Sequence, residues 1–215
     1  MQSGLAFRSQ FVLMGQTAEG HCVMCREALV TAFHDDRLYL FERAEQHSAS
    51  VFGGPMPSHV SGRSYGPKPL HRIACLGCWH LPMLSQHHLI ELPLVYGMHY
   101  SACDLSYRVE YAHKIELLSI EPAASMDDWP YLNFPALLPY VPMRLNDTPG
   151  RASYDEFASR FPNMPEQQTA ELMIAVPPPA TLGFSLWGDG DGEGVTILFE
   201  CDLKNRNVRA TNVAS

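Results

Sequence analysis

The feature that most constrains this chain is a pair of Cys-x-x-Cys motifs that lie far apart in the sequence. Cys22 and Cys25 form the first motif, and Cys75 and Cys78 form the second. Each motif presents two thiolates to one ion, and two such pairs complete a tetrahedral zinc site. The same spacing occurs in thiol–disulfide redox centres, where a helix N-terminus lowers the thiol pKa. Four unconnected thiols are the third possibility, because free cysteine often behaves as a small buried hydrophobic residue.

The residues around each pair, GHCVMCREAL at 20–29 and ACLGCWHL at 74–81, resemble the knuckles of zinc ribbons. This local resemblance implies a structural Zn²⁺ ion held by the four cysteines. Residues 26–74 separate the pairs, whereas about 15–20 residues are usual. An inserted loop explains the longer spacing, because extra loop length adds little closure entropy. We therefore expect a zinc-ribbon-like element over residues 20–80, with the Gly/Pro-rich residues 52–69 as the inserted loop.

Composition favours a globular protein that binds another protein. The chain has 215 residues, of which 46% are hydrophobic and 18% charged, so we expect a single domain over residues 1–215 with a sizeable core. The net charge of −8 argues against nucleic-acid binding and suits a basic protein partner. No apolar run is long enough to span a membrane, and the N-terminus does not resemble an export signal. These features predict a cytoplasmic protein.

Short apolar runs predict strands over much of the chain. Residues 28–33 and 38–43 flank a polar turn, which predicts a hairpin, although a helix over Glu27–His34 fits the same residues. Residues 105–111 alternate between apolar and polar side chains, as in a half-buried strand. The tail, residues 182–214, has the pattern of a strand, an acidic Gly-rich loop and two further strands joined by a turn.

Helical signals are few. Ser153 and Glu156 form a capping box at the start of a helix over residues 153–161, and a second helix is expected over residues 165–175. Five prolines within residues 122–142 exclude a long helix or a central strand, so we expect an irregular apolar segment. The predicted fold class is α+β, mainly antiparallel β, with one or two short helices and the zinc-ribbon-like element.

Exposed aromatic and acidic side chains are the candidates for a partner surface, because aromatic residues dominate interface hot spots and acidic loops steer basic partners. The glycines of residues 187–194 make that loop easy to expose. Its acidic residues also resemble half of a calcium-binding loop, but strand-like sequence stands where the flanking helices are needed. The predicted partner-binding residues are Trp129, Tyr131, Tyr140, Asp189, Asp191 and Glu193.

No nucleophile, metalloprotease or phosphate-binding motif is present. We therefore expect a non-enzymatic protein-binding module, and an acidic immunity-type inhibitor of a basic toxin such as a nuclease is a concrete version. The alternative is a metal-dependent hydrolase that uses His71, His80 and His87 with Asp104. A zinc-ribbon protein that binds nucleic acid is disfavoured by the acidic charge.

The zinc hypothesis predicts about one zinc ion per chain, with sulfur atoms about 2.3 Å from the metal. Elemental analysis of untagged protein, purified without chelators, measures the stoichiometry. Replacing Cys22, Cys25, Cys75 and Cys78 by serine should abolish binding, whereas Cys103→Ser should leave it unchanged. Protein that is metal-free after such a purification would contradict the hypothesis.

Overall fold

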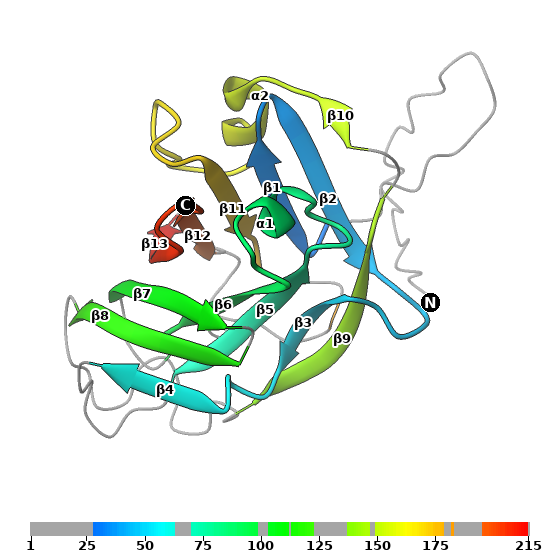
Figure 1. The fold of residues 1–215 in the computed structure, drawn as a ribbon. Helices are drawn as coiled ribbons and strands as arrows, with labels where there is room; N and C mark the ends of the chain where they lie inside the picture. The colour runs from blue at the N-terminus through cyan, green and yellow to red at the C-terminus, as the bar shows by residue number, and fades with distance from the viewer. Residues whose placement is uncertain are drawn as a thin grey trace, which may run out of the picture.

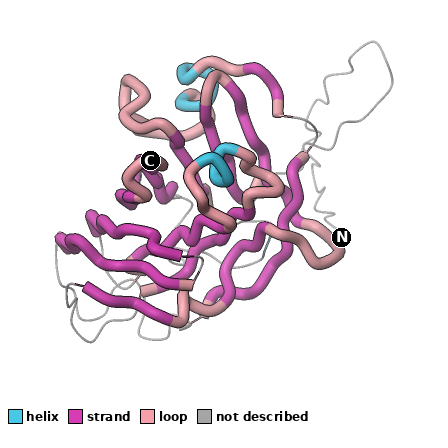
Figure 2. Tube along the Cα trace, in the orientation of Figure 1, coloured by secondary structure: helices cyan, strands magenta, loops and turns pink. Residues whose placement is uncertain are grey.

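The structure is a computed structural model, which describes residues 28–62, 70–98, 103–111, 113–122, 137–146, 149–178, 182 and 195–214. Strands dominate this part of the chain (Figures 1 and 2). The strands are β1 (Val30–His34), β2 (Arg37–Arg43), β3 (Ser50–Gly54), β4 (His59–Gly62), β5 (His71–Gly77), β6 (Glu91–Tyr96), β7 (Cys103–Tyr111), β8 (Lys114–Pro122), β9 (Leu138–Leu145), β10 (Gly150–Arg151), β11 (Leu172–Val176), β12 (Val195–Asp202) and β13 (Asn207–Ala214). The two short helices of the described chain are α1 (Met83–Gln86) and α2 (Tyr154–Ala158).

All thirteen strands belong to one sheet, in the order β4-β8-β7-β13-β12-β11-β1-β2-β9-β3-β5-β6, and β10 pairs with β2 off this path. β4 runs parallel to β8, and the other pairings of the described strands are antiparallel. The sheet curls, so β6 at one end of the order lies beside β7 near the other end (Figure 1). The curled sheet encloses one hydrophobic core, to which strands from both ends contribute.

The α+β prediction is wrong, because nearly all of the regular structure is strand in a single sheet. The zinc-ribbon-like element over residues 20–80 is wrong as well. Its described part supplies β1 to β5, which pair with strands from the rest of the chain rather than forming a separate ribbon. The expected inserted loop over residues 52–69 contains β4 and the end of β3. Cys22 and Cys25 lie outside the described residues.

The predicted hairpin at residues 28–43 is confirmed as β1 and β2. Asp35 and Asp36 form the two-residue turn with φ angles of 48° and 53°. Positive φ at both positions matches the twist of the flanking strands, and aspartate tolerates this region better than most residues. The competing helix over Glu27–His34 is therefore wrong.

The central strands β1, β11 and β12 are buried on both faces, which explains their nearly continuous apolar sequences. In β11, Ile174 points into the enclosed core, whereas its neighbour Met173 belongs to a second cluster on the outer face. Side chains from α2 and the residues after it cover that outer cluster, and Phe157 is its fully buried centre.

The helix predicted over residues 153–161 is confirmed in a shorter form as α2. The Glu156 amide donates to the Ser153 hydroxyl at 3.2 Å, which is the N-terminal half of the predicted capping box. The second helix, predicted over residues 165–175, is wrong, because β11 occupies its last four residues. β11 pairs with β1 and β12, and its side chains are buried in the two hydrophobic clusters.

The irregular segment predicted around the five prolines, residues 121–145, is wrong at both ends: its last eight residues form β9, and its first two end β8. Pro142 lies opposite Val51 of β3. The Pro142 carbonyl accepts a hydrogen bond from the Ala44 amide, on the side of β9 that faces away from β3. In a strand, the nitrogen and the carbonyl of one residue point to the same side. The missing N–H of Pro142 therefore removes no hydrogen bond between β9 and β3.

Two buried tyrosine hydroxyl groups join β6 to β7. The Tyr107 hydroxyl accepts from the Val95 amide at 3.1 Å and donates to the Pro93 carbonyl at 2.8 Å. In the other direction, the Tyr96 hydroxyl accepts from the Cys103 amide at 3.0 Å and donates to the same residue's carbonyl at 3.1 Å. Burial raises the pKa of both tyrosines above their ordinary value, so both hydroxyls keep the proton that they donate.

We expect Tyr107→Phe to lower the free energy of unfolding by about 1–3 kcal/mol, because the buried Val95 amide loses its acceptor. Urea unfolding at neutral pH measures the change. Tyr140→Phe is the matched control, since Tyr140 is 51% exposed, and it should shift stability by less than about 0.5 kcal/mol. Equal effects of the two substitutions would contradict the role of the Tyr107 hydroxyl.

Candidate functional site

The connection between β5 and β6, residues 78–90, contains the second half of the second predicted knuckle and two of the candidate histidines, His80 and His87. The Cys78 amide donates to the Ile90 carbonyl at 2.8 Å, which continues the pairing of the two strands. Between these residues, Leu81, Leu84 and Leu89 are buried in the core around α1. The connection is therefore anchored at its base and along its inner side, and its polar and exposed residues are held on a packed support.

Cys75 and Cys78, the described half of the predicted zinc site, occupy different environments. Cys75 is buried within β5, and its Sγ lies 3.6 Å from a carboxylate oxygen of Glu91. Burial, followed by the charge of Glu91, raises the pKa of Cys75 to about 12, so its thiol is protonated at neutral pH. Cys78 is partly exposed in the turn after β5. The zinc hypothesis thus requires a bound metal to displace the proton of Cys75.

Ser50, which is buried, and His80, which is partly exposed, form a hydrogen-bonded pair at the base of the connection. The Ser50 hydroxyl accepts from the Gly77 amide at 3.0 Å and lies 2.7 Å from Nδ1 of His80. Burial lowers the pKa of His80, which favours the neutral ring, and the tautomer of that ring decides whether Nδ1 accepts from the hydroxyl or donates to it. A serine beside a histidine is also the pairing of a nucleophile and its base, but Ser50 has no exposed surface. The pair therefore helps to fix the start of the connection, and the Ser50 hydroxyl has no access to a substrate.

Gly77 is required for this arrangement. A Cβ atom at this position would lie 2.5 Å from the Ala49 carbonyl oxygen, which is too close for any other residue. The close approach of the two backbones brings the end of β5 within reach of the Ser50 hydroxyl.

The side chains of the hydrolase hypothesis do not come together. His71 is buried at the first residue of β5, whereas His80 lies three residues past its last, so the length of the strand separates them. His87 lies near Glu171, which the hypothesis did not include. Asp104 lies on β7 and binds an arginine of the neighbouring strand.

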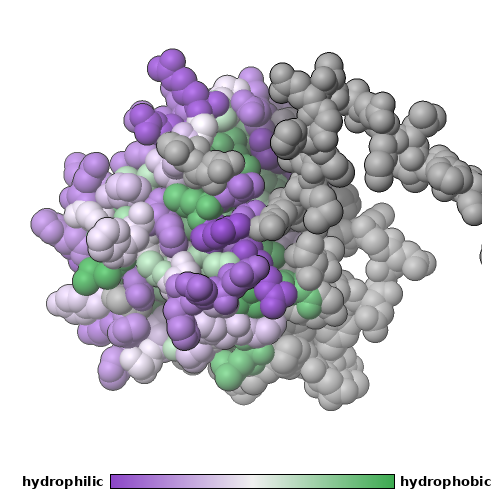
Figure 3. All heavy atoms as spheres, turned by 90° about the vertical axis from the view of Figure 1, so that its right-hand side faces the viewer, coloured by the Kyte–Doolittle hydropathy of each residue, from purple (hydrophilic) through white to green (hydrophobic). Residues whose placement is uncertain are grey.

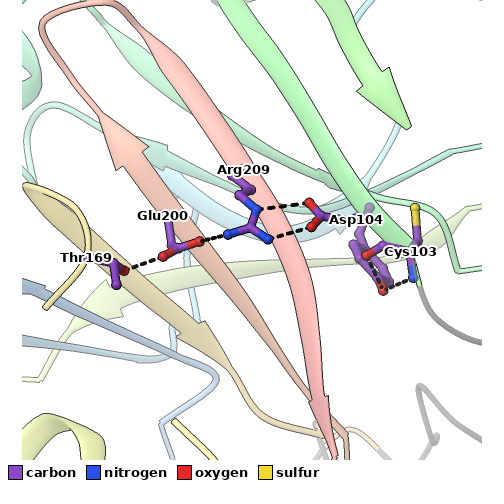
Figure 4. Close-up of polar contacts among 6 residues, drawn as sticks. Cys103, Asp104, Thr169, Glu200 and Arg209 are labelled. Carbon is purple, nitrogen blue, oxygen red and sulfur yellow. Dashed lines mark hydrogen bonds and ion pairs between the residues drawn. The ribbon is translucent and has the colours of Figure 1, made fainter. Parts of the chain in front are cut away.

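That arginine belongs to a row of ionic contacts across β12, β13 and β7 (Figure 4). Arg209 contacts both oxygens of Asp104, at 3.0 and 2.5 Å, and reaches Glu200 at 3.3 Å. The Thr169 hydroxyl donates to the other oxygen of Glu200. The side chains are partly exposed and satisfy one another, so the row is a cross-strand structural contact worth about 0.2–1 kcal/mol per pair.

Tyr140 is the one predicted partner-binding residue that lies in the described chain. It is about half exposed and lines a groove of about 1210 Å³ between residues 42–48 and 140–144. An ion pair between Arg144 and Glu42, 2.6 Å long, crosses β9 and β2 at this groove. The other five predicted residues lie outside the described chain: Trp129, Tyr131, Asp189, Asp191 and Glu193.

The most exposed aromatic side chain of the described chain was missed as a candidate. Trp79 is 85% exposed, and Ile90, across the connection, is 72% exposed. Both are held by the Cys78–Ile90 backbone bond at the end of the β5–β6 pairing. A tryptophan directly after Cys78 was the signal that could have marked this surface. The sequence did not show whether its ring was buried or exposed. On the face in Figure 3, by contrast, described hydrophobic residues form small separate patches.

A second group that the sequence did not indicate consists of His34, His87 and Glu171. Both imidazoles approach one carboxylate oxygen, at 3.7 and 3.8 Å. The residues come from the end of β1, the end of α1 and the approach to β11. No local motif could have revealed the group, because the tertiary fold alone brings these three elements together.

No family model, curated protein or solved structure matches this chain. The two helices of the described residues are too short to cross a membrane.

Ser50→Ala should lower the free energy of unfolding by about 1–3 kcal/mol, because it leaves the buried Gly77 amide without its acceptor. Chemical denaturation measures this loss. Ser85→Ala is the control, because Ser85 is an exposed residue of α1, and it should change stability by less than about 0.5 kcal/mol. An unchanged stability of Ser50→Ala would show that the Ser50–His80 pair does not anchor the connection.

Proposed function

We propose that this protein is a non-enzymatic protein-binding module and that Trp79 is a central contact of its binding surface. The observation that carries the proposal is the 85% exposure of this indole on a connection that is otherwise anchored in the core. Tryptophan is among the residues that most often dominate interface energies. A support that is already ordered reduces the entropy lost on binding, which favours a stable complex.

Ile90 extends the apolar contact beside the same hydrogen-bonded pair of strands. Tyr140, about half exposed in its polar groove, is a second accessible aromatic contact. The proposed surface also includes residues predicted from the sequence alone. These are Trp129, Tyr131 and the acidic loop with Asp189, Asp191 and Glu193.

The proposed partner is a basic protein. The net charge of −8 accelerates association with a positively charged surface, and this effect weakens as salt screens the charges. A cytoplasmic immunity-type inhibitor, which covers a basic toxin such as a nuclease, is the concrete form of the proposal. The separation of His71 from His80 gives the hydrolase alternative no support. Structural zinc on the four cysteines remains a separate proposal.

The test compares wild-type protein with Trp79→Ala as bait in affinity capture from cells of the native source. We expect at least one basic protein to be retained by the wild type and lost by the variant. With that protein purified, surface plasmon resonance should show dissociation accelerated about tenfold or more, which corresponds to about 1.4 kcal/mol or more. Its association rate should fall as salt is raised.

Tyr111→Ala is the matched control, because Tyr111 is a large exposed aromatic residue on β7 rather than on the connection. It should retain the same protein with unchanged kinetics. For the immunity form, the wild type should also inhibit the activity of the captured protein, and Trp79→Ala should inhibit it less. A partner that is acidic, or binding that is equal for wild type and Trp79→Ala, would refute the proposal.

A further inference from the structure

His34, His87 and Glu171 meet at one end of the β1–β11 pair, next to the C-terminus of α1. His34 is the last residue of β1, and Glu171 directly precedes β11, the antiparallel neighbour of β1. His87 caps the C-terminus of α1, where its amide donates to the Leu84 carbonyl. All three side chains are partly exposed, so the group can be reached from solvent.

The distances within this group leave space for a ligand between the side chains. Oε1 of Glu171 lies 3.7 Å from Nε2 of His34 and 3.8 Å from Nε2 of His87. Both separations are too long for hydrogen bonds. The same carboxylate oxygen is therefore near both imidazole nitrogens without a direct hydrogen bond to either. Within the described chain, no lysine or arginine forms an ion pair with Glu171.

We propose that His34, His87 and Glu171 bind a divalent transition-metal ion of the zinc class. Two imidazole nitrogens and one carboxylate oxygen are a ligand set that such ions prefer. Three protein ligands leave at least one coordination position for water, in contrast to the closed four-cysteine site expected from the sequence. The proposed site is independent of the binding surface at Trp79 and of the four cysteines.

Metal binding at these residues requires their side chains to move closer together. Ligand atoms about 2.0–2.1 Å from a tetrahedral ion lie about 3.4 Å apart, which is about 0.4 Å closer than the separations present here. In the described chain, no three His, Cys, Asp or Glu side chains are arranged to hold a metal as they stand. Glu171 is 45% exposed, and its side chain can rotate to supply the required shift.

The test is a Co²⁺ titration of the untagged full-length chain, followed by visible absorption. A site made of imidazole and carboxylate gives cobalt d–d bands without the thiolate-to-metal charge-transfer band that a cysteine site adds. We expect His87→Asn to weaken this Co²⁺ binding about tenfold or more, since a direct ligand contributes at least as much as outer partners, whose loss costs about 10–100-fold. Glu171→Gln should weaken it similarly.

His88→Asn is the matched control. His88 is exposed, directly follows His87 and has a φ of 57°, a conformation that asparagine tolerates. It should bind Co²⁺ as the wild type does, and circular dichroism should show that all variants are folded. The proposal is overturned if the wild type binds no Co²⁺, if the bound cobalt shows only a thiolate signature, or if Glu171→Gln binds it unchanged.

Discussion

Two tyrosine hydroxyl groups hold the ends of the sheet order together, and the enclosed core depends on this closure. In the described chain, β6 pairs with β5 and forms no backbone ladder with β7. Side-chain hydrogen bonds join β6 to β7 instead. The Tyr107 hydroxyl binds the Pro93 carbonyl and the Val95 amide, and the Tyr96 hydroxyl binds both backbone groups of Cys103. Each hydroxyl thus satisfies two buried backbone groups that would otherwise lack partners.

This closure also determines what the β5–β6 connection can do. β6 pairs with β5 on one side and is hydrogen-bonded to Tyr107 of β7 on the other. The connection therefore starts and ends on strands that are held in place. Gly77, Ser50 and His80 hold its first turn, and buried leucines hold α1. The exposed Trp79 and the partly exposed His87 are therefore displayed from a rigid base. A rigid base favours recognition of a partner or an ion, since little order has to be gained on binding.

The errors in the sequence analysis have a common cause. Residues 165–175 and 138–142 were assigned from local signals, a proline at a helix start and prolines within an apolar run. In the fold, the two hydrophobic clusters cover the two faces of β11, and Pro142 directs its missing amide towards Ala44, just past the end of β2. A strand buried on both faces carries no clear alternation, and a proline is tolerated where a ladder ends. Neither condition can be read from the segment alone.

The sequence by itself determined the features that depend on near neighbours. The β1–β2 hairpin follows from two apolar runs around Asp35 and Asp36, the start of α2 from the Ser153 cap, and β7 from its period of two. The tertiary structure alone decided that the strands form one curled sheet, that Trp79 is exposed and that His34, His87 and Glu171 meet. The physical reason is the sequence separation of the interacting residues. Turns and caps are stabilised by contacts within a few residues. Burial and side-chain clusters arise from strands that are distant in the chain and pair only in the folded protein.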